Sequence, residues 1–205
     1  MKRTAEDVLR EEYASLLPEL RFLRHVMQVT ANHSLLDVRE TLGGHERIDV
    51  ESRVKSCESA IDKVRRRTEG GTFDPSTRYS LTQLKDLVGV RVLVFPKQRA
   101  KDAIIRLKRA FPRWRADHLP ALGVYKFHGK IRPGDPVGAE YQVVPALVGM
   151  FWAVEHDTFY KPDPALRGAE KHPRLQAARE RLEKELVAFE DTFQEVVEGG
   201  PPRVL

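Results

Sequence analysis

Lys55, Ser59 and Lys63 stand four residues apart within a basic stretch at residues 53–67. On a helix, side chains at this spacing lie one above the other over two turns, so two ammonium groups and a hydroxyl would form one row. Such a row suits a chain of phosphates, because charged hydrogen bonds to phosphate oxygens are short and strong. The stretch therefore predicts a helix with an anion-binding face. The alternative is a solvated basic surface, which is common on helices.

Two acidic residues stand in otherwise apolar or uncharged surroundings further along the chain. Asp86 precedes Gly89 and the β-branched run 90–95, and Glu140 lies in the run 139–144. Apolar runs of this length and composition predict β-strands. A carboxylate in such surroundings is costly unless a cation compensates it. Asp86 and Glu140 together therefore predict a divalent metal site.

Length and composition bound the class of protein. The 205 residues suffice for one α/β-sized domain with helical extensions. The single cysteine, Cys57, excludes a disulfide framework or a zinc cluster within one chain and fits a reducing compartment. The charged start and the absence of a bilayer-length apolar stretch predict a soluble, cytoplasmic protein without a membrane partner. A net charge of +5 favours anionic partners such as nucleotides, RNA or an acidic protein.

The spacing of apolar residues predicts the order of the elements. Pro18 should kink or divide the first helical stretch, giving two short helices or one bent one. We expect an α+β fold: a mixed sheet of four to five strands flanked by helices, with N- and C-terminal helical extensions. The expected domains are an N-terminal extension at 1–48, a core at 49–165 and a C-terminal extension at 166–205. The expected helices are 5–29, 34–42, 53–67, 101–111, 146–160 and 175–197, and the expected strands are 90–95, 125–131 and 139–144.

Four blocks of residues occur in order between about residues 50 and 161. They are Arg53-x-Lys55-x-x-x-Ser59-x-x-x-Lys63, Asp86-Leu-Val-Gly-Val-Arg91-Val, Glu140-x-Gln142, and Phe151-Trp-Ala-Val-Glu-His156 followed by Tyr160-Lys161. Together they resemble the RelA/SpoT-type pyrophosphokinases, specifically the small alarmone synthetases. The resemblance covers over half of the chain.

The resemblance implies an enzyme that transfers the β,γ-pyrophosphate of ATP to a ribose 3′-hydroxyl and releases AMP, with Mg²⁺ as cofactor. It implies that Asp86 is a magnesium ligand and that Glu140 either shares the metal or takes the proton from the attacking hydroxyl. Gln142 would be a neighbour in the pocket. The implied ATP-binding residues are Arg53, against adenine, and Lys55, Ser59 and Lys63, on the phosphates.

The acceptor side departs from the family pattern. The family has a Gly-Tyr-x-x-x-His segment whose tyrosine lies against the acceptor base, whereas this chain has Gly123-Val-Tyr125-Lys-Phe-His128. A shift of one residue turns a strand side chain to the other face unless a bulge corrects the register. Tyr125, His128 and Gln142 are the acceptor-binding candidates, and position 124 competes with Tyr125 for the stacking role.

The altered segment favours an acceptor other than a free guanosine nucleotide. Toxic relatives of similar size pyrophosphorylate the 3′ end of tRNA or make adenosine alarmones, and an antitoxin protein restrains them. We expect a tRNA acceptor, with GDP, GTP or an adenosine nucleotide as the alternative. The basic residues expected to contact RNA phosphates are Arg65, Arg66, Arg67, Lys97, Arg99 and Lys101.

Two other readings of the chain stay open. A non-catalytic module could keep the pocket to bind a nucleotide or RNA. An interaction protein could instead use its long terminal helices. The apolar residues of 175–197 recur at spacings of three, four and seven, so this helix must dock on its own domain, on another copy in a homo-oligomer, or on an inhibitory partner. The His156-Asp157 pair lacks the further ligands that a metal-dependent phosphohydrolase needs.

Overall fold

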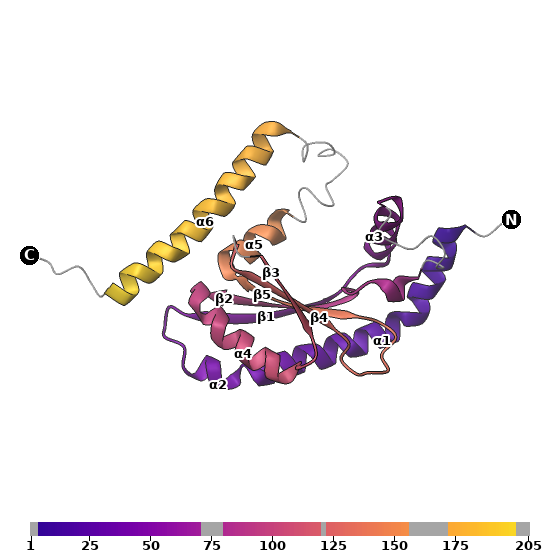
Figure 1. The fold of residues 1–205 in the computed structure, drawn as a ribbon, viewed down its shortest axis with the longest axis horizontal. Helices are drawn as coiled ribbons and strands as arrows, with labels where there is room; N and C mark the ends of the chain where they lie inside the picture. The colour runs from indigo at the N-terminus through magenta and orange to yellow at the C-terminus, as the bar shows by residue number, and fades with distance from the viewer. Residues whose placement is uncertain (1–3, 71–79, 120–121, 156–171, 200–205) are drawn as a thin grey trace, which may run out of the picture.

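The computed structural model describes residues 4–70, 80–119, 122–155 and 172–199 as one sheet with helices on both faces (Figure 1). The helices are α1 (Ala5–Ser34), α2 (Leu36–Glu40), α3 (Cys57–Glu69), α4 (Ala100–Ala110), α5 (Ala146–Glu155) and α6 (Pro173–Gly199). The strands are β1 (Arg47–Val54), β2 (Val88–Phe95), β3 (Arg115–Leu119), β4 (Val124–Gly129) and β5 (Ala139–Pro145). Short 3₁₀ turns occupy Leu81–Gln83 and Lys97–Arg99.

The five strands form one mixed sheet in the order β1-β2-β5-β4-β3. Strands β2 and β5 are parallel, and the other neighbouring pairs are antiparallel. Strands β4 and β5 form a hairpin across residues 130–138, which are rich in turn residues. The mixed α+β class predicted from the sequence is confirmed.

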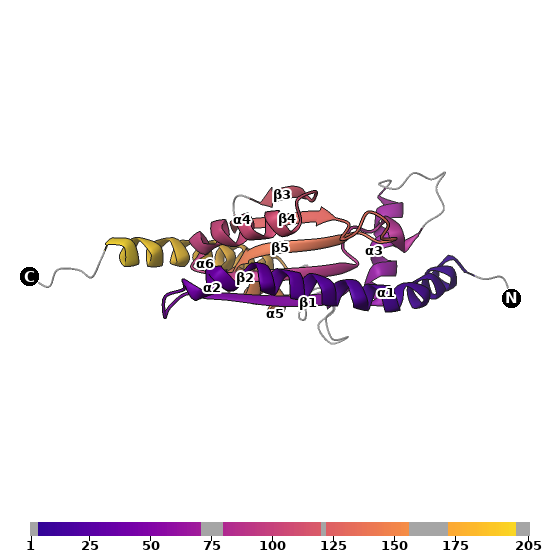
Figure 2. The ribbon, with the colours of Figure 1, turned by 90° about the horizontal axis from the view of Figure 1, so that it is seen from below.

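The two faces of the sheet are covered differently. Helices α1 and α4 lie across one face, where valines of β2 alternate with residues of the other face, and Figure 2 shows both helices in front of the sheet. The main core lies here and includes the fully buried Phe127 and Tyr141, whose rings stack at 4.4 Å. On the other face, α5 covers only the half that carries Leu93, Val124 and Val144. The remaining half is left for polar side chains.

The predicted helix at 53–67 is wrong at its start. Arg53 and Val54 end β1, Lys55 lies in the connection, and α3 begins at Cys57. The alternation of charged and apolar residues along 47–54 has the period of a strand, and β1 pairs with β2 over its whole length. Ser56 is the helix N-cap, and its hydroxyl accepts a hydrogen bond from the Ser59 backbone N–H at 3.4 Å.

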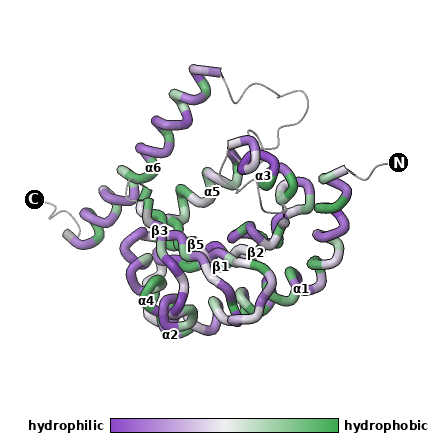
Figure 3. Tube along the Cα trace, turned by 45° about the vertical axis from the view of Figure 1, so that its right-hand side comes forward, coloured by the Kyte–Doolittle hydropathy of each residue, from purple (hydrophilic) through white to green (hydrophobic). Residues whose placement is uncertain are grey.

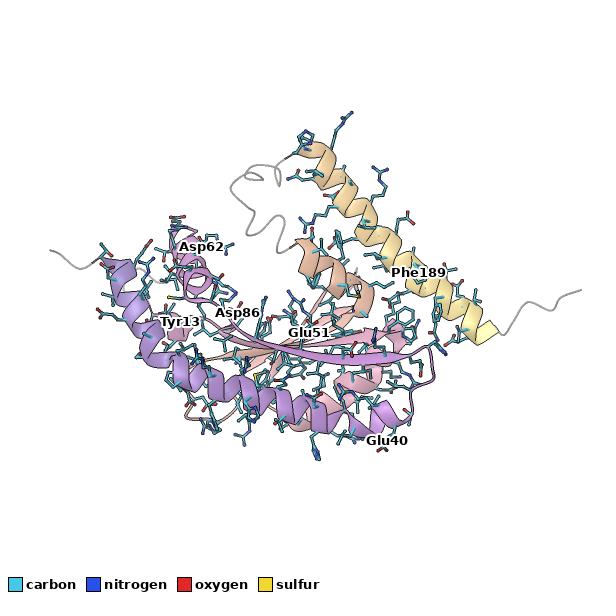
Figure 4. All side chains as sticks on the ribbon, turned by 180° about the vertical axis from the view of Figure 1, so that it is seen from behind. Tyr13, Glu40, Glu51, Asp62, Asp86 and Phe189 are labelled. Carbon is cyan, nitrogen blue, oxygen red and sulfur yellow. The ribbon has the colours of Figure 1, made fainter. Side chains whose placement is uncertain are left out.

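The N-terminal stretch is one continuous helix that contains Pro18 and bends, rather than two helices (Figure 4). The sequence reading missed β1 and also β3, a short strand at the sheet edge. The expected boundary between residues 48 and 49 falls inside β1, and that between 165 and 166 lies outside the described residues. None of the described helices combines the length and hydropathy that a bilayer crossing requires.

Candidate functional site

A pocket of about 470 Å³ opens on the uncovered half of the sheet. The strand register sets two rows of side chains on this face, since paired residues on neighbouring strands point the same way. One row runs Arg53, Gly89, Glu140, His128, Arg115, and the other runs Glu51, Arg91, Gln142, Lys126, Asp117. Seven of these ten residues line the pocket, together with Asp86, Trp152, Ala153, Glu155 and Arg179 among others. Its volume is in the range of small-molecule sites.

Asp86 is the most strongly held acid of the site. Its Oδ2 accepts Lys63 Nζ at 2.6 Å and lies 3.2 Å from Lys55 Nζ, while only 14% of its side chain is exposed. Burial alone would raise the pKa of Asp86, but the two lysines outweigh it and hold the pKa below its usual value. The two lysines therefore favour the charged form of the carboxylate. Figure 4 labels Asp86 among the side chains near α3.

The backbone around Lys55 is fixed from two sides. Its N–H donates to the Leu87 carbonyl at 2.8 Å, and its carbonyl accepts the Tyr13 hydroxyl of α1 at 2.8 Å. These bonds hold Lys55 beside Asp86 although it lies outside the helix. Sequence reasoning missed Tyr13, which no local pattern connects to residue 55.

Lys55 has more cations than acids near it: Lys63 and Arg53 against Asp86. Burial lowers the pKa of Lys55, and Lys63 and Arg53 add to that effect, so that the attraction of Asp86 does not restore the usual value. Burial and then the neighbouring Arg53 likewise lower the pKa of Arg91, against the opposing effect of Glu51 and Glu140. The two lysines, by contrast, share the single carboxylate of Asp86. A further anion would relieve this crowding of positive charge.

Glu140 has a different environment from Asp86. Its Oε1 accepts the amide of Gln142, and its Oε2 lies 3.4 Å from His128 Nδ1. His128 Nε2 in turn lies 3.3 Å from Asp117 on β3. The predicted residues Glu140, Gln142 and His128 are thus brought together on two adjacent strands.

The acids of the site fit a hard divalent cation. Asp86 Oδ1 is buried and has no hydrogen-bond partner among the described residues, so its lone pairs are open to a cation. No group of three or more His, Cys, Asp or Glu side chains gathers around a common point in the described part of the chain. A site with one or two carboxylates suits Mg²⁺, which usually keeps several waters and takes its other ligands from substrate phosphates.

The wall opposite Asp86 comes from α5 and α6. Trp152 Nε1 donates to Glu183 of α6 at 2.8 Å, and Lys126 Nζ lies 6.0 Å from the centre of the indole ring. Arg179 of α6 forms an ion pair with Glu155. Burial raises the pKa of Glu155, and Arg179 opposes that rise. The sequence reading assigned no site role to these five residues, because the contacts join segments far apart in the chain.

Tyr125 lies on the opposite face of β4 from the pocket. Its ring packs against the main core, and it pairs in register with Val143. Val124 points to the pocket face but is buried against Leu93 and Val144, under α5. The regular β4–β5 register contains no bulge that would return Tyr125 to the pocket.

The remaining predicted residues are placed as follows. Arg53 lines the pocket, whereas Ser59 lies in the first turn of α3, bonded to Ser56, and is not a lining residue. Lys55 and Lys63 are not lining residues, but both form ion pairs with Asp86, which lines the pocket. His156, Tyr160 and Lys161 lie outside the described residues.

Most of the basic residues expected to contact RNA are already paired. Arg65 and Arg66 bind Asp62, Arg99 binds Glu46, and Lys97 binds Asp191. Lys97 and Arg99 follow the end of β2, while α3 lies by its start, about 26 Å away for an eight-residue strand. The basic residues therefore form two groups at opposite ends of the sheet.

No protein-family model matches the sequence, and no curated protein sequence matches it either. Solved structures do. A GTP pyrophosphokinase family protein from Streptococcus pneumoniae has a TM-score of 0.68 and 16% identity, over 92% of this chain and 94% of that one. Small alarmone synthetase 1 from Bacillus subtilis gives 0.65 and 15% when bound to its product pppGpp, over 92% and 97%. Bound to AMPCPP it gives 0.61 and 16%, over 91% and 96%.

These likenesses extend over nearly the full length of both chains. At this level of identity they establish the fold, which is that of the small alarmone synthetases. The match covers 92% of this chain, so the unmatched residues are fewer than either terminal helix contains.

Proposed function

We propose that this protein is an ATP-dependent pyrophosphokinase. The observation that supports this most is the environment of Asp86. Its carboxylate binds two lysines through one oxygen, has no hydrogen-bond partner for the other among the described residues, and lines the same pocket as Glu140. A cationic cradle, a hard cation on oxygen ligands and one base are the parts that phosphoryl-type transfer requires. The fold likeness to a protein solved with AMPCPP and with pppGpp supports the same reaction.

In this proposal the donor ATP lies along the Lys55 and Lys63 side of the pocket. The two ammonium groups bind its phosphates, Arg53 lies against adenine, and Ser59 contributes a hydroxyl from the first turn of α3. The surplus of positive charge around Lys55 supports this orientation, because a triphosphate supplies the missing anion.

Asp86 would hold Mg²⁺, and Glu140 would be a second ligand where it does not act as the base. When bound, the cation neutralises charge on the transferred phosphates. The open Oδ1 of Asp86 supports its role as a ligand.

The transfer itself needs one proton acceptor. The ribose 3′-oxygen of the acceptor attacks the β-phosphorus of ATP, the bond from that phosphorus to the α,β-bridging oxygen breaks, and AMP leaves. Glu140 takes the proton of the attacking hydroxyl, while Gln142 and His128 orient its carboxylate.

The first candidate for the acceptor is the 3′ end of tRNA, which would make the protein a toxin that inhibits translation and is restrained by an antitoxin. The absence of a tyrosine ring on the pocket face of β4 supports an acceptor that does not depend on that contact. The second candidate is a purine nucleotide such as GDP, GTP or ATP. It is favoured by the ion pairs that already neutralise most of the basic residues and by the pppGpp bound to the structural neighbour.

The test is incubation with Mg²⁺ and ATP labelled in its γ-phosphate, together with GDP, GTP, unlabelled ATP or bulk tRNA. We expect AMP in equal amount to labelled acceptor. Label on tRNA that declines steeply with salt identifies an RNA acceptor, and salt-indifferent label on a nucleotide identifies an alarmone synthetase. ATP binding without AMP formation on any acceptor would contradict the proposal and indicate a non-catalytic binding module.

A further inference from the structure

One aromatic side chain lines the pocket and has no part in the mechanism so far. Among the described residues that line the pocket, Trp152 of α5 is the only one with an aromatic ring. Strand β4 contributes none, because Tyr125 packs against the main core and Val124 is covered by α5. An accessible aromatic ring among charged side chains is a typical surface for stacking a nucleobase.

The indole of Trp152 is held in place from two sides. Its Nε1 donates to Glu183 of α6 at 2.8 Å, and this bond docks α6 on its own domain. The ring also packs against the apolar cluster that contains Leu93, Val124 and Val144. Figure 3 shows α5 as a largely hydrophobic helix beside the more hydrophilic α6. The ring is only half-buried, so its remaining surface is a fixed platform that loses little freedom when a ligand stacks on it.

A lysine lies over the ring of Trp152. Lys126 Nζ is 6.0 Å from the centre of the indole, which is the outer limit of an attraction between a cation and a ring. Lys126 forms no ion pair within the part of the chain that the structure describes. A lysine is a compact charge on a flexible chain. A base can therefore take the space beside the ring while the ammonium group binds a phosphate of the same nucleotide.

Trp152 and the proposed donor residues lie on opposite sides of Glu140. Asp86 precedes β2, Glu140 is on β5, and Lys126 is on β4, in the sheet order β2-β5-β4. Gln142 connects the last two, since it donates to Glu140 and pairs in register with Lys126. An acceptor whose ribose 3′-hydroxyl meets Glu140 therefore extends away from the donor, toward β4 and Trp152.

We propose that Trp152 is the stacking surface for the purine base of the acceptor, and that Glu183 is the positioning residue that holds its indole. Lys126 binds a phosphate on the 5′ side of the same nucleoside. This inference rests on the proposed pyrophosphokinase function and deepens it. The acceptor is a purine nucleoside with a free 3′-hydroxyl, either as a free nucleotide or as the last nucleotide of an RNA. A pyrimidine offers less surface to the ring and binds more weakly.

The fluorescence of Trp152 tests the stack without requiring transfer. The chain has two tryptophans, so Trp114→Phe leaves Trp152 as the only one. Trp114 packs against the rings of Phe111 and Tyr141 in the core, where phenylalanine keeps an aromatic contact. The donor side is first saturated with AMPCPP and Mg²⁺, and GDP, ADP or a short RNA ending in CCA is then added. We expect the acceptor to quench the emission saturably, and the probe that does so distinguishes a free nucleotide from an RNA end.

This measurement separates the stack from the proposed function. Emission that none of the probes changes, in a chain that forms AMP from ATP with one of them, would overturn the stack and leave the enzymatic function standing. Quenching by a probe without any AMP formation would support the stack and contradict the enzymatic function.

Steady-state kinetics distinguish stacking from a structural role. Trp152→Leu should raise the KM of the acceptor about tenfold or more, because a stacked base is lost. The KM of ATP and kcat should change less than about twofold. Phe151→Leu is the matched control, since Phe151 is the neighbouring aromatic residue of α5 and is not a lining residue. A rise in the KM of ATP alone would place the ring on the donor side and overturn the proposal.

The bond from the indole to Glu183 tests the positioning role and does not require loss of the ring. Glu183→Ala should raise the acceptor KM several-fold and shift the emission of Trp152. Glu183→Gln should keep wild-type values, because its amide oxygen still accepts the indole N–H. Glu180→Ala, at an exposed position of the same helix, is the control. An acceptor KM that is unchanged in Glu183→Ala, or equally raised in Glu183→Gln, would overturn the positioning role.

Discussion

One face of the sheet has an open half and a half covered by helices, and each half has a buried acid. The pKa of the acid is lowered in the open half and raised in the covered half. In the open half, Asp86 is surrounded by two lysines, and its pKa is held low. In the half covered by α5 and α6, Glu190 of α6 is 1% exposed, and neither of its carboxylate oxygens has a hydrogen-bond partner among the described residues. Burial raises the pKa of Glu190. The nearby backbone N–H groups of Lys97 and Leu147 oppose the rise, although they lie outside ordinary hydrogen-bond geometry.

The different surroundings of Asp86 and Glu190 indicate which of the two buried acids can bind a ligand in the pocket. The strands are the same in both halves, and what changes is the helix above them: α5 covers Leu93, Val124 and Val144, and no helix covers the rows at Glu140 and Arg91. An acid that is compensated by excess cations and keeps an open oxygen is arranged for a ligand. Glu190 is buried on α6 and only partly compensated, so its charged form weakens the docking of that helix at neutral pH.

The largest expected effect comes from the two acids of the open half. Asp86→Asn and Glu140→Gln should each reduce pyrophosphate transfer by about two orders of magnitude or more, as loss of a metal ligand or a base does. Initial rates with saturating ATP measure this. Asp49→Asn is the matched control, because Asp49 lies on the same face of β1 and is exposed. Full transfer by Glu140→Gln would remove Glu140 from the proposed mechanism.

The covered half should resist a larger side chain at position 124. Val124 is fully buried, so Val124→Tyr should lower the free energy of unfolding by about 1–3 kcal/mol through overpacking and should gain no acceptor binding. Urea unfolding and acceptor titration measure the two effects. The control is Leu119→Tyr, since Leu119 pairs with Val124 in register but is exposed. Improved acceptor binding with unchanged stability would show that the pocket extends to residue 124.

The lysines of the open half should affect donor binding more mildly. Lys55→Ala and Lys63→Ala each remove one cation and leave Asp86 with the other, so we expect the dissociation constant for ATP to rise about tenfold in each. Isothermal titration at two salt concentrations should also show a weaker salt dependence. Lys101→Ala, an exposed lysine on α4, is the control. Unchanged ATP binding in the double variant would contradict the proposal and favour the alternative, a solvated basic surface without a role in ATP binding.

The same division explains what the sequence could and could not predict. The valine-rich strand β2, the hairpin of β4 and β5, and α4 follow from local periodicity, and so did the mixed α+β class. Asp86 and Glu140 stood out because each is a lone acid in its stretch. The last two residues of β1, Arg53 and Val54, were included in the expected helix because the spacing of Lys55, Ser59 and Lys63 fits a helical period. Of these three residues, only Ser59 and Lys63 are helical.

Other features of the site depend on the tertiary fold. The link from Tyr13 to Lys55 and the wall made by Trp152, Glu155 and Arg179 join residues from distant segments. The sequence shows that either residue 124 or Tyr125 faces the pocket, because a shift of one residue turns a strand side chain to the other face of the sheet. It does not decide between the two. Only the pairing with β5 assigns Tyr125 to the core side.

The smallest expected effect concerns Glu190. Its pKa in the folded protein is raised above the unfolded value, so the folded state binds the proton more tightly and stability falls as pH rises through that interval. Glu190→Gln removes this dependence and should stabilise the protein by about 1 kcal/mol at pH 8 relative to wild type, with little difference at acidic pH. Thermal unfolding at several pH values measures this, and hydrogen exchange of α6 amides locates it. Glu195→Gln, on the exposed side of the same helix, should change neither. If Glu190→Gln were instead less stable than wild type at pH 8, the carboxylate would be compensated as Asp86 is, and the contrast between the two halves would fail at this residue.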